Sequence, residues 1–286
     1  MRRTLALALI AVATSLAVSC DSQPATPPPP AGQSARIVTL MPSGTEVVAA
    51  LGAAGMLVGV DDYSVFPPEV KRLPKVGSFT GPNLESIVAL HPTLVIVDDI
   101  HRDAEKALHG AGIATVQCAF HALGDVEAAL HTVGATLQRS SQADAVIAEI
   151  HAAIANATAH RPAHHPKVLA IIDRETGGLG GMVAAGPGSW VDELLAVVGG
   201  DNALATSGVR YPKISIEEVL AAKPDVILDL SYAGSGPNAA AAWHDVAVPA
   251  VSAGHVVMLS EPYLMAPSPR IAPALAALAK AIQTAP

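Results

Sequence analysis

Several residue types are scarce in this chain of 286 residues, and each shortage excludes a class of function. The 17 Lys and Arg are outnumbered by 25 Asp and Glu, which gives a formal net charge of −8. No cluster of basic residues is present, and this argues against nucleic acid as a partner. After the first twenty residues, no apolar run reaches the ~18 residues of a transmembrane helix, so no further membrane span is predicted.

Enzyme signatures are missing as well. The sequence contains no G-x-S-x-G, no G-x-G-x-x-G after a strand, no G-x-x-x-x-G-K-[ST] and no H-E-x-x-H. An esterase that uses Ser43 or Ser189 is an alternative that no motif supports. The eleven histidines are scattered along the chain, so we predict neither a protein metal site nor a catalytic residue.

The chain has only two cysteines, and they stand in different contexts. Residues 1–19 begin with two arginines and continue as a short apolar stretch, which is typical of a secretory signal peptide. Cys20 ends the sequence Leu-Ala-Val-Ser-Cys, which has the order of a bacterial lipobox, so lipidation of Cys20 is predicted. Asp21 favours retention at the inner membrane. Cys118 lies in an apolar run and is expected to be a buried, unreactive side chain.

The rest of the sequence predicts a tether followed by two lobes. Residues 20–34 include four consecutive prolines and are expected to form an extended tether. Strand and helix patterns then alternate, which indicates an α/β fold with parallel sheets. One long helix is predicted over 136–160, between an N-terminal lobe at 35–135 and a C-terminal lobe at 161–286. Both lobes are expected to be Rossmann-like, with a ligand cleft between them.

The two lobes share a repeated pattern. Asn83 to Val97 and Ser215 to Asp229 align at a constant offset of 132, each with a capping residue, a Glu, an apolar helix, a Pro and a strand. Glu85 and Glu217 occupy equivalent positions in the two copies. They either compensate the helix dipoles or form a symmetric pair of charges that docks on a two-fold partner, and the pattern leaves both readings open.

Aromatic residues make up only 3% of the chain, and several of them fall in loops beside strand ends. Binding residues concentrate in such loops, and aromatic rings suit a large, flat, partly apolar ligand. The candidate ligand-binding residues are Tyr63, Phe79, Tyr211 and Tyr232 in loops, Tyr263 in an irregular stretch, Trp190 at a helix start and His101 after a strand.

Five stretches carry a family resemblance, namely 63–68, 75–85, 188–195, 211–217 and 268–271. They resemble the periplasmic binding proteins of cobalamin, haem and ferric-siderophore ABC importers, and the cobalamin-binding members most closely. The resemblance implies a rigid bridging helix and a monomer that is not an enzyme. Such a protein captures a metal chelate, here a cobalt corrinoid, and delivers it to a permease dimer. The implied location is the periplasm, or the outer face of a Gram-positive cell.

The resemblance also implies roles for individual residues. Tyr63, Phe79 and Tyr211 match positions where the cobalamin-binding members place rings against the corrin. Glu85 and Glu217 match the two glutamates that meet permease arginines in that family.

The sequence departs from the family pattern at two places. The stretch 262–266 lacks the Asp and Arg that cobalamin-binding members carry there, and Ser78 stands where haem-binding members usually have a Tyr ligand. Two alternatives within the family stay open. A ferric-siderophore binder would use cations such as Arg174, Arg210 and Lys213, and a haem carrier would need an axial ligand such as His101.

Overall fold

The N-terminal lobe is built on a parallel sheet whose strands are almost entirely apolar. The computed structural model describes residues 35–231 and 239–283. The sheet has the order β2-β1-β5-β6, and every neighbouring pair is parallel. Its strands are β1 (Ile37–Thr39), β2 (Leu57–Val60), β5 (Leu94–Val97) and β6 (Ala114–Gln117). A parallel sheet is covered on both faces, which is why β5 reads Leu-Val-Ile-Val and is buried throughout.

Helices and short 3-10 turns alternate with these strands. The helices are α1 (Pro42–Ala50), α2 (Leu84–Ala89), α3 (Arg102–Gly110) and α4 (Leu123–Thr136). The 3-10 turns are η1 (Ala54–Met56), η2 (Pro68–Arg72) and η3 (Asp99–His101). A small antiparallel hairpin, β3 (Gly77–Ser78) and β4 (Gly81–Pro82), stands apart from the main sheet.

The C-terminal lobe has a second sheet, of order β11-β10-β7-β8, in which only β8 is antiparallel to its neighbour. A further strand, β9, pairs with β7 in parallel. The strands are β7 (Lys167–Asp173), β8 (Val183–Ala184), β9 (Asp201–Asn202), β10 (Val226–Asp229) and β11 (Val256–Met258). The helices are α6 (Trp190–Val198), α7 (Ile216–Ala222), η5 (Ala239–Trp243), α8 (Pro249–Ser252), α9 (Pro262–Met265) and α10 (Ile271–Gln283).

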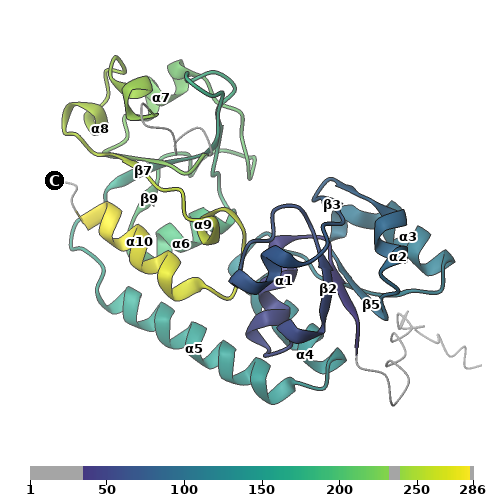
Figure 1. Cartoon of the computed structure of the whole chain (residues 1–286). Coiled ribbons are helices and arrows are strands. Elements are labelled where there is room, and N and C mark those ends of the chain that lie inside the picture. Colours follow the sequence, from purple (N-terminus) through teal and green to yellow (C-terminus); the bar gives the residue numbers. More distant parts are fainter. Residues whose placement is uncertain (1–34, 232–238, 284–286) are drawn as a thin grey trace, which may run out of the picture.

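One helix runs along both lobes. α5 (Ser140–Ala159) packs against α1 and α4 on one side of the molecule and against α6 and α10 on the other (Figure 1). Its 20 residues span about 30 Å at 1.5 Å per residue. Within the described residues, no helix combines the length and apolarity that a bilayer crossing requires.

The start of this helix differs from the sequence prediction, which ran one helix from 136 to 160. The chain instead bends after α4, and α5 begins only at Ser140. Gln138 adopts a φ of 58°, which no right-handed helix tolerates, so the helical path is interrupted there. Arg139 fixes the bend, because its guanidinium donates to the carbonyl of Leu51 over 3.2 Å.

The repeat seen in the sequence reappears in the structure. α2 and β5 begin at Leu84 and Leu94, and α7 and β10 begin at Ile216 and Val226, so both pairs are separated by 132 residues. Each copy is therefore one helix followed by one central strand, placed once in each lobe (Figure 1).

Candidate ligand-binding cleft

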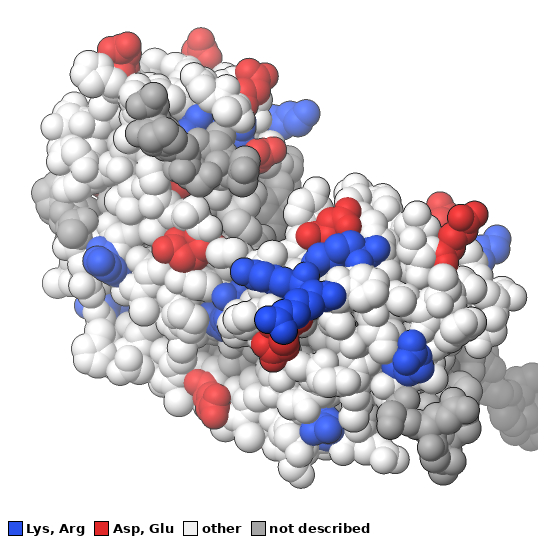
Figure 2. Space-filling model, viewed as in Figure 1, with Lys and Arg blue, Asp and Glu red and all other residues white. Residues whose placement is uncertain are grey.

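A cleft of about 1,010 Å³ lies between the lobes. The N-terminal lobe lines it with the start of α1 and with residues that follow β2, β5 and β6. These are the carboxyl ends of parallel strands, where open α/β sheets bind their ligands. The opposite wall comes from Tyr211, from the end of β10 and from the segment 260–267. Figure 2 shows the hollow between the lobes, with Lys, Arg, Asp and Glu side chains gathered on the N-terminal lobe beside it.

Three of the predicted aromatic residues line this cleft. Tyr63 follows β2 and is 64% exposed, and Phe79 lies in the tip of the β3–β4 hairpin. Tyr211 faces them from the C-terminal lobe and is 42% exposed. Burial raises the pKa of the Tyr211 hydroxyl. The sequence reasoning missed a fourth ring, Phe120, although its position just after β6 is the same signal that drew attention to the other loops.

Two other predicted ligand-binding residues lie elsewhere. Trp190 is 2% exposed and belongs to the hydrophobic core. The cause is its place at the first turn of α6, where the apolar face of the helix turns inward. Tyr263 packs its ring against the guanidinium of Arg270, 5.0 Å away, and is not part of the lining. Tyr232 lies outside the described residues.

His101 was predicted as a ligand-binding residue, and the structure uses both of its ring nitrogens internally. Nδ1 accepts a hydrogen bond from the backbone N–H of Asp98 over 2.9 Å. Nε2 therefore carries the proton and donates to the carbonyl of Phe79 over 2.6 Å. The two rings meet edge to face at 5.3 Å. With 4% exposure, His101 holds Phe79 in place and offers no free nitrogen to a haem iron.

The charged groups in the lining are acidic, apart from one histidine. Glu46, Asp62 and Asp98 line the cleft together with His121, whereas no Lys or Arg among the described residues does. The segment 232–238, next to the cleft residue Ser231, contains no Lys or Arg in its sequence.

Among the carboxylates that line the cleft, Asp98 has the most strongly perturbed pKa. Burial raises the pKa of Asp98 to about 6, and a shared hydrogen bond with Asp99 adds to the rise. The same hydrogen bond lowers the pKa of Asp99, whose Oδ2 also lies 3.2 Å from Nε2 of His121. Ligand atoms of these three residues lie within 4.8 Å of one another. Asp98 also accepts from the N–H of Ile100, so it caps the η3 turn.

One carboxylate of the lining forms an ion pair with an arginine of the C-terminal lobe. Glu46, 7% exposed on α1, accepts two hydrogen bonds from Arg270, which directly precedes α10. The Nε donor lies 2.7 Å from Oε2. The ring of Phe66 covers the guanidinium at 4.2 Å. Glu46 and Arg270 thus clasp the N-terminal lobe to the C-terminal segment beside the cleft.

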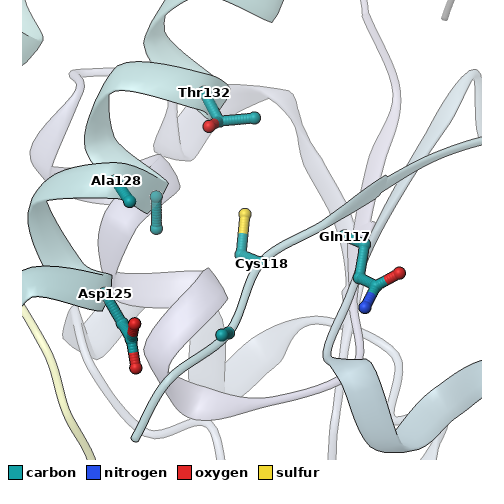
Figure 3. A pocket seen from close by; sticks show the side chains of 7 residues that line it. Gln117, Cys118, Asp125, Ala128 and Thr132 are labelled. Carbon is teal, nitrogen blue, oxygen red and sulfur yellow. The ribbon is translucent and has the colours of Figure 1, made fainter. Parts of the chain in front are cut away.

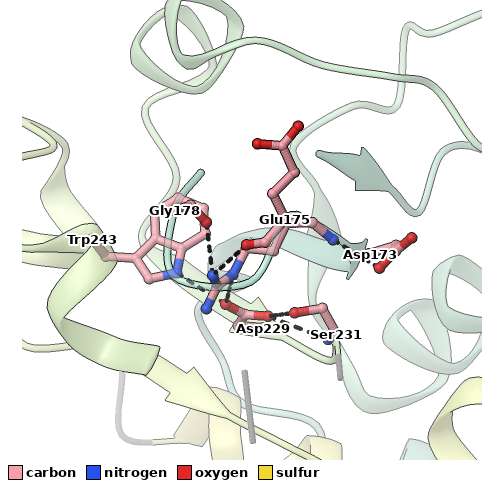
Figure 4. Close-up of polar contacts among 7 residues, drawn as sticks. Asp173, Glu175, Gly178, Asp229, Ser231 and Trp243 are labelled. Atoms are coloured by element: carbon pink, nitrogen blue, oxygen red, sulfur yellow. Dashed lines mark hydrogen bonds and ion pairs between the residues drawn. The ribbon is translucent and has the colours of Figure 1, made fainter. Parts of the chain in front are cut away.

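The cations proposed for a siderophore do not line the cleft. Arg174 is buried and pairs with Asp229 over 2.7 Å, and it also donates to the carbonyl of Gly178 (Figure 4). Asp229 accepts in addition from Trp243 and from Ser231. This network fixes the end of β10, and Ser231 lies in the cleft wall. Arg210 and Lys213 are exposed and lie outside the lining.

The two serines of the esterase alternative and Cys118 lie in different surroundings. Cys118 is buried beside a cavity of about 110 Å³ (Figure 3), and burial raises the pKa of its thiol to about 12. Ser189 is fully buried and caps α6, where its hydroxyl donates to the carbonyl of Gly186 over 2.8 Å. Ser43 is 4% exposed at the start of α1, in the cleft floor.

Glu85 and Glu217 are exposed and lie in the first turns of α2 and α7. The predicted caps of these helices are present. Asn83 accepts from the N–H of Ser86, and Ser215 and Glu218 form a capping box. A hydrogen bond from its own backbone N–H, followed by the Ser215 hydroxyl, lowers the pKa of Glu217 and keeps it ionised.

Two α/β lobes joined by one helix, with a cleft between them that aromatic rings line, are the architecture of a binding protein. Comparison with known proteins agrees with that class. The family described as "Periplasmic binding protein" matches residues 37–263, so the chain belongs to the periplasmic binding protein family. It is the non-enzymatic, substrate-binding component of an ABC importer, and its partners are a permease and a small ligand.

Individual relatives differ in what they bind. The vitamin B12-binding protein of Vibrio campbellii is 26% identical over 255 residues, which cover 88% of this chain and 91% of that protein. The periplasmic haem-binding protein of Roseiflexus sp. RS-1, in apo form, superimposes with a TM-score of 0.77 at 31% identity, covering 87% of this chain and 98% of that one. For the vitamin B12-binding protein of Vibrio cholerae the TM-score is 0.70 at 26% identity, with 87% and 96% covered.

Proposed function

We propose that this protein binds cobalamin or a related corrinoid and delivers it to its importer. The observation that carries the proposal is the charge of the cleft, whose lining contains no Lys or Arg among the described residues. Of its three carboxylates, Glu46 is already paired with Arg270, which leaves Asp62 and Asp98 to meet a ligand. A corrin ring carries neutral amide side chains, whose N–H groups are donors, and carboxylates accept from such donors. Haem propionates and ferric catecholate siderophores are anionic and would meet the carboxylates of Asp62 and Asp98, with no Lys or Arg in the described lining to pair with them.

The rings of the cleft suit the same ligand. Tyr63 and Phe79 on one wall and Tyr211 on the other provide apolar faces on both sides of the space. A macrocycle held between them would be bound by ring stacking and shape complementarity. The carboxylates would accept hydrogen bonds from donors on its edge. In this proposal, the rings of these three residues contact the corrin.

Docking on the permease is assigned to Glu85 and Glu217. Both are exposed, and one lies on each lobe at equivalent positions of the repeat. Two like charges related by an internal repeat suit a partner with two equivalent subunits, each with a cation to receive one glutamate.

A lipid anchor at Cys20 would hold the protein at the inner membrane. Support comes from the lipobox order of residues 16–20 and from the Pro-rich tether that follows, which lies outside the described residues. Mass spectrometry of the protein recovered from membranes should show a diacylglyceryl-modified Cys20 as the first residue. A Cys20→Ser chain released unmodified would agree, and an unmodified wild-type Cys20 would refute the anchor.

Calorimetry with the chain from Gln33 onward tests the ligand. Cyanocobalamin should bind one to one, and Phe79→Ala or Tyr211→Ala should weaken it at least tenfold. Val209→Ala, an exposed residue outside the lining, is the matched control. Parallel titrations use cobinamide, hemin and a ferric hydroxamate. No heat with either corrinoid would overturn the ligand assignment and leave the importer role intact.

Haem is the second candidate, and a specific observation favours it. Tyr63, Tyr211 and His121 all line the cleft, and each side chain is chemically able to bind iron. If hemin binds with a Soret shift while corrinoids do not, Tyr63→Phe, Tyr211→Phe and His121→Gln will identify the axial ligand.

A further inference from the structure

Exposed apolar side chains fall at equivalent positions of the two repeated helices. Val88 on α2 is 42% exposed and Leu220 on α7 is 38% exposed. They are separated by 132 residues, the same offset that relates Glu85 to Glu217. In both helices the apolar residue follows the glutamate by three positions, so the two share one helix face.

Packing fixes the direction of this face. The residue just before the exposed one, Ile87 in α2 and Val219 in α7, is fully buried in each case. Since these neighbours fix the buried side of each helix, and consecutive residues point about 100° apart, Val88 and Leu220 are held away from the core in the folded protein. The exposure is therefore a property of the packed helices in both lobes.

The location of these two residues sets them apart from the other exposed apolar side chains. Among the described residues, seven other large hydrophobic side chains are exposed, and most belong to the cleft. Tyr63, Val65, Ile100, Tyr211 and Met265 line it, Phe66 covers Arg270, and Val209 stands two residues before Tyr211. Val88 and Leu220 are not in the lining. Single exposed apolar residues need no explanation, whereas a pair related by the repeat and adjoining a pair of charges does.

We propose that Val88 and Leu220 are the apolar half of a two-part docking contact, used once on each permease subunit. This inference rests on the proposed docking role of Glu85 and Glu217. The partner is a two-fold permease dimer whose subunits each present a cation beside an apolar surface. An apolar contact next to an ion pair excludes water from it, which strengthens the attraction and makes part of the affinity independent of salt.

The test uses the full-length chain and the permease–ATPase complex encoded by the same organism, reconstituted in nanodiscs. The double variant Val88→Thr, Leu220→Gln removes the apolar groups with little change in shape or helix propensity. Its affinity for the complex should fall at least tenfold, and each single variant should lose a smaller factor. Val209→Thr, which changes an exposed valine outside the two helices, is the control and should match wild type.

Salt dependence supplies a second readout. Binding of wild type should retain a fraction of its strength at 0.5 M NaCl, and the double variant should lose that residual binding. Glu85→Gln, Glu217→Gln should instead abolish the salt-sensitive part. An affinity of the double variant within twofold of wild type, together with weaker binding by the glutamate variant, would refute the apolar contact and leave the docking role of the glutamates standing. If the glutamate variant also binds like wild type, the proposed docking role of Glu85 and Glu217 is refuted as well.

Discussion

At the scale of single residues, Asp98 is a cleft carboxylate whose ionised form destabilises the folded protein because it is buried. Burial raises its pKa from 3.8 to about 6, so the folded protein holds a proton that the unfolded chain releases between about pH 4 and pH 6. Because the folded state binds more protons in this window, the contribution of Asp98 to stability declines as the pH rises through it. Near neutral pH, the ionised Asp98 therefore opposes folding and can accept a hydrogen bond from a ligand.

Asp98→Asn tests this account. Its side-chain oxygen can still accept from the N–H of Ile100, so the cap of η3 is kept. The stability of the variant relative to wild type should increase from pH 4 to pH 7, by on the order of 2 kcal/mol, since one pKa unit corresponds to about 1.4 kcal/mol. Urea unfolding at several pH values measures it, with the exposed Glu149→Gln as a control. A pH-independent difference between Asp98→Asn and wild type would contradict the raised pKa.

At the scale of elements, periodicity and capping were sufficient for much of the fold. The helices around Glu46, Glu85 and Glu217 and the strands at 95 and 226 follow from short apolar runs bounded by caps, and these features are local. The bend at Gln138 was missed because nothing in the polar, helix-compatible sequence there signals a positive φ. It depends on the contact of Arg139 with Leu51, 88 residues away in the chain.

The candidate site was predicted only in part, for the same reason. Loop position identified Tyr63, Phe79 and Tyr211, which line the cleft. The same rule failed for Trp190 and His101, because whether a side chain at a strand or helix end faces the cleft or the core depends on tertiary packing. Glu46 reads as an ordinary helix residue, and nothing local in the sequence signals its pairing with Arg270, 224 positions away.

The β3–β4 hairpin is the element on which Phe79 depends. Gly77 adopts a φ of 103°, and a Cβ there would lie 2.5 Å from the carbonyl oxygen of Gly81 and 2.8 Å from the N of Asn83. Both are backbone atoms, so no side-chain movement relieves the clash.

Gly77→Ala should therefore distort the hairpin and displace Phe79 from the cleft. We expect a loss of about 1–3 kcal/mol in the free energy of unfolding, the usual size of such backbone strain, and a fall in ligand affinity comparable to that of Phe79→Ala. Gly55→Ala, where a Cβ meets nothing within 4 Å, is the matched control. Wild-type affinity in Gly77→Ala would show that the hairpin does not position the ring.

At the scale of the whole molecule, the lobes are held by more than α5. The pair of Glu46 and Arg270 joins α1 of the N-terminal lobe to the segment leading into α10, which packs on α5 and α6. The rings of Phe66 and Tyr263 flank the guanidinium at 4.2 and 5.0 Å. α5 packs against both lobes, and this ion pair joins them beside the cleft. A movement of one lobe relative to the other would therefore have to break the ion pair.

A double-mutant cycle on the clasp tests this arrangement. Glu46→Gln and Arg270→Gln each leave one largely buried charge without its partner, so each should lower the free energy of unfolding by about 3 kcal/mol. The double variant buries no unpaired charge from this pair and should lose clearly less than the sum of the two. Urea unfolding at pH 7 gives all four values. Additive losses, within about 0.5 kcal/mol, would mean that the two residues do not stabilise the protein as a pair. The joint between the lobes would then depend on α5 and its apolar contacts alone.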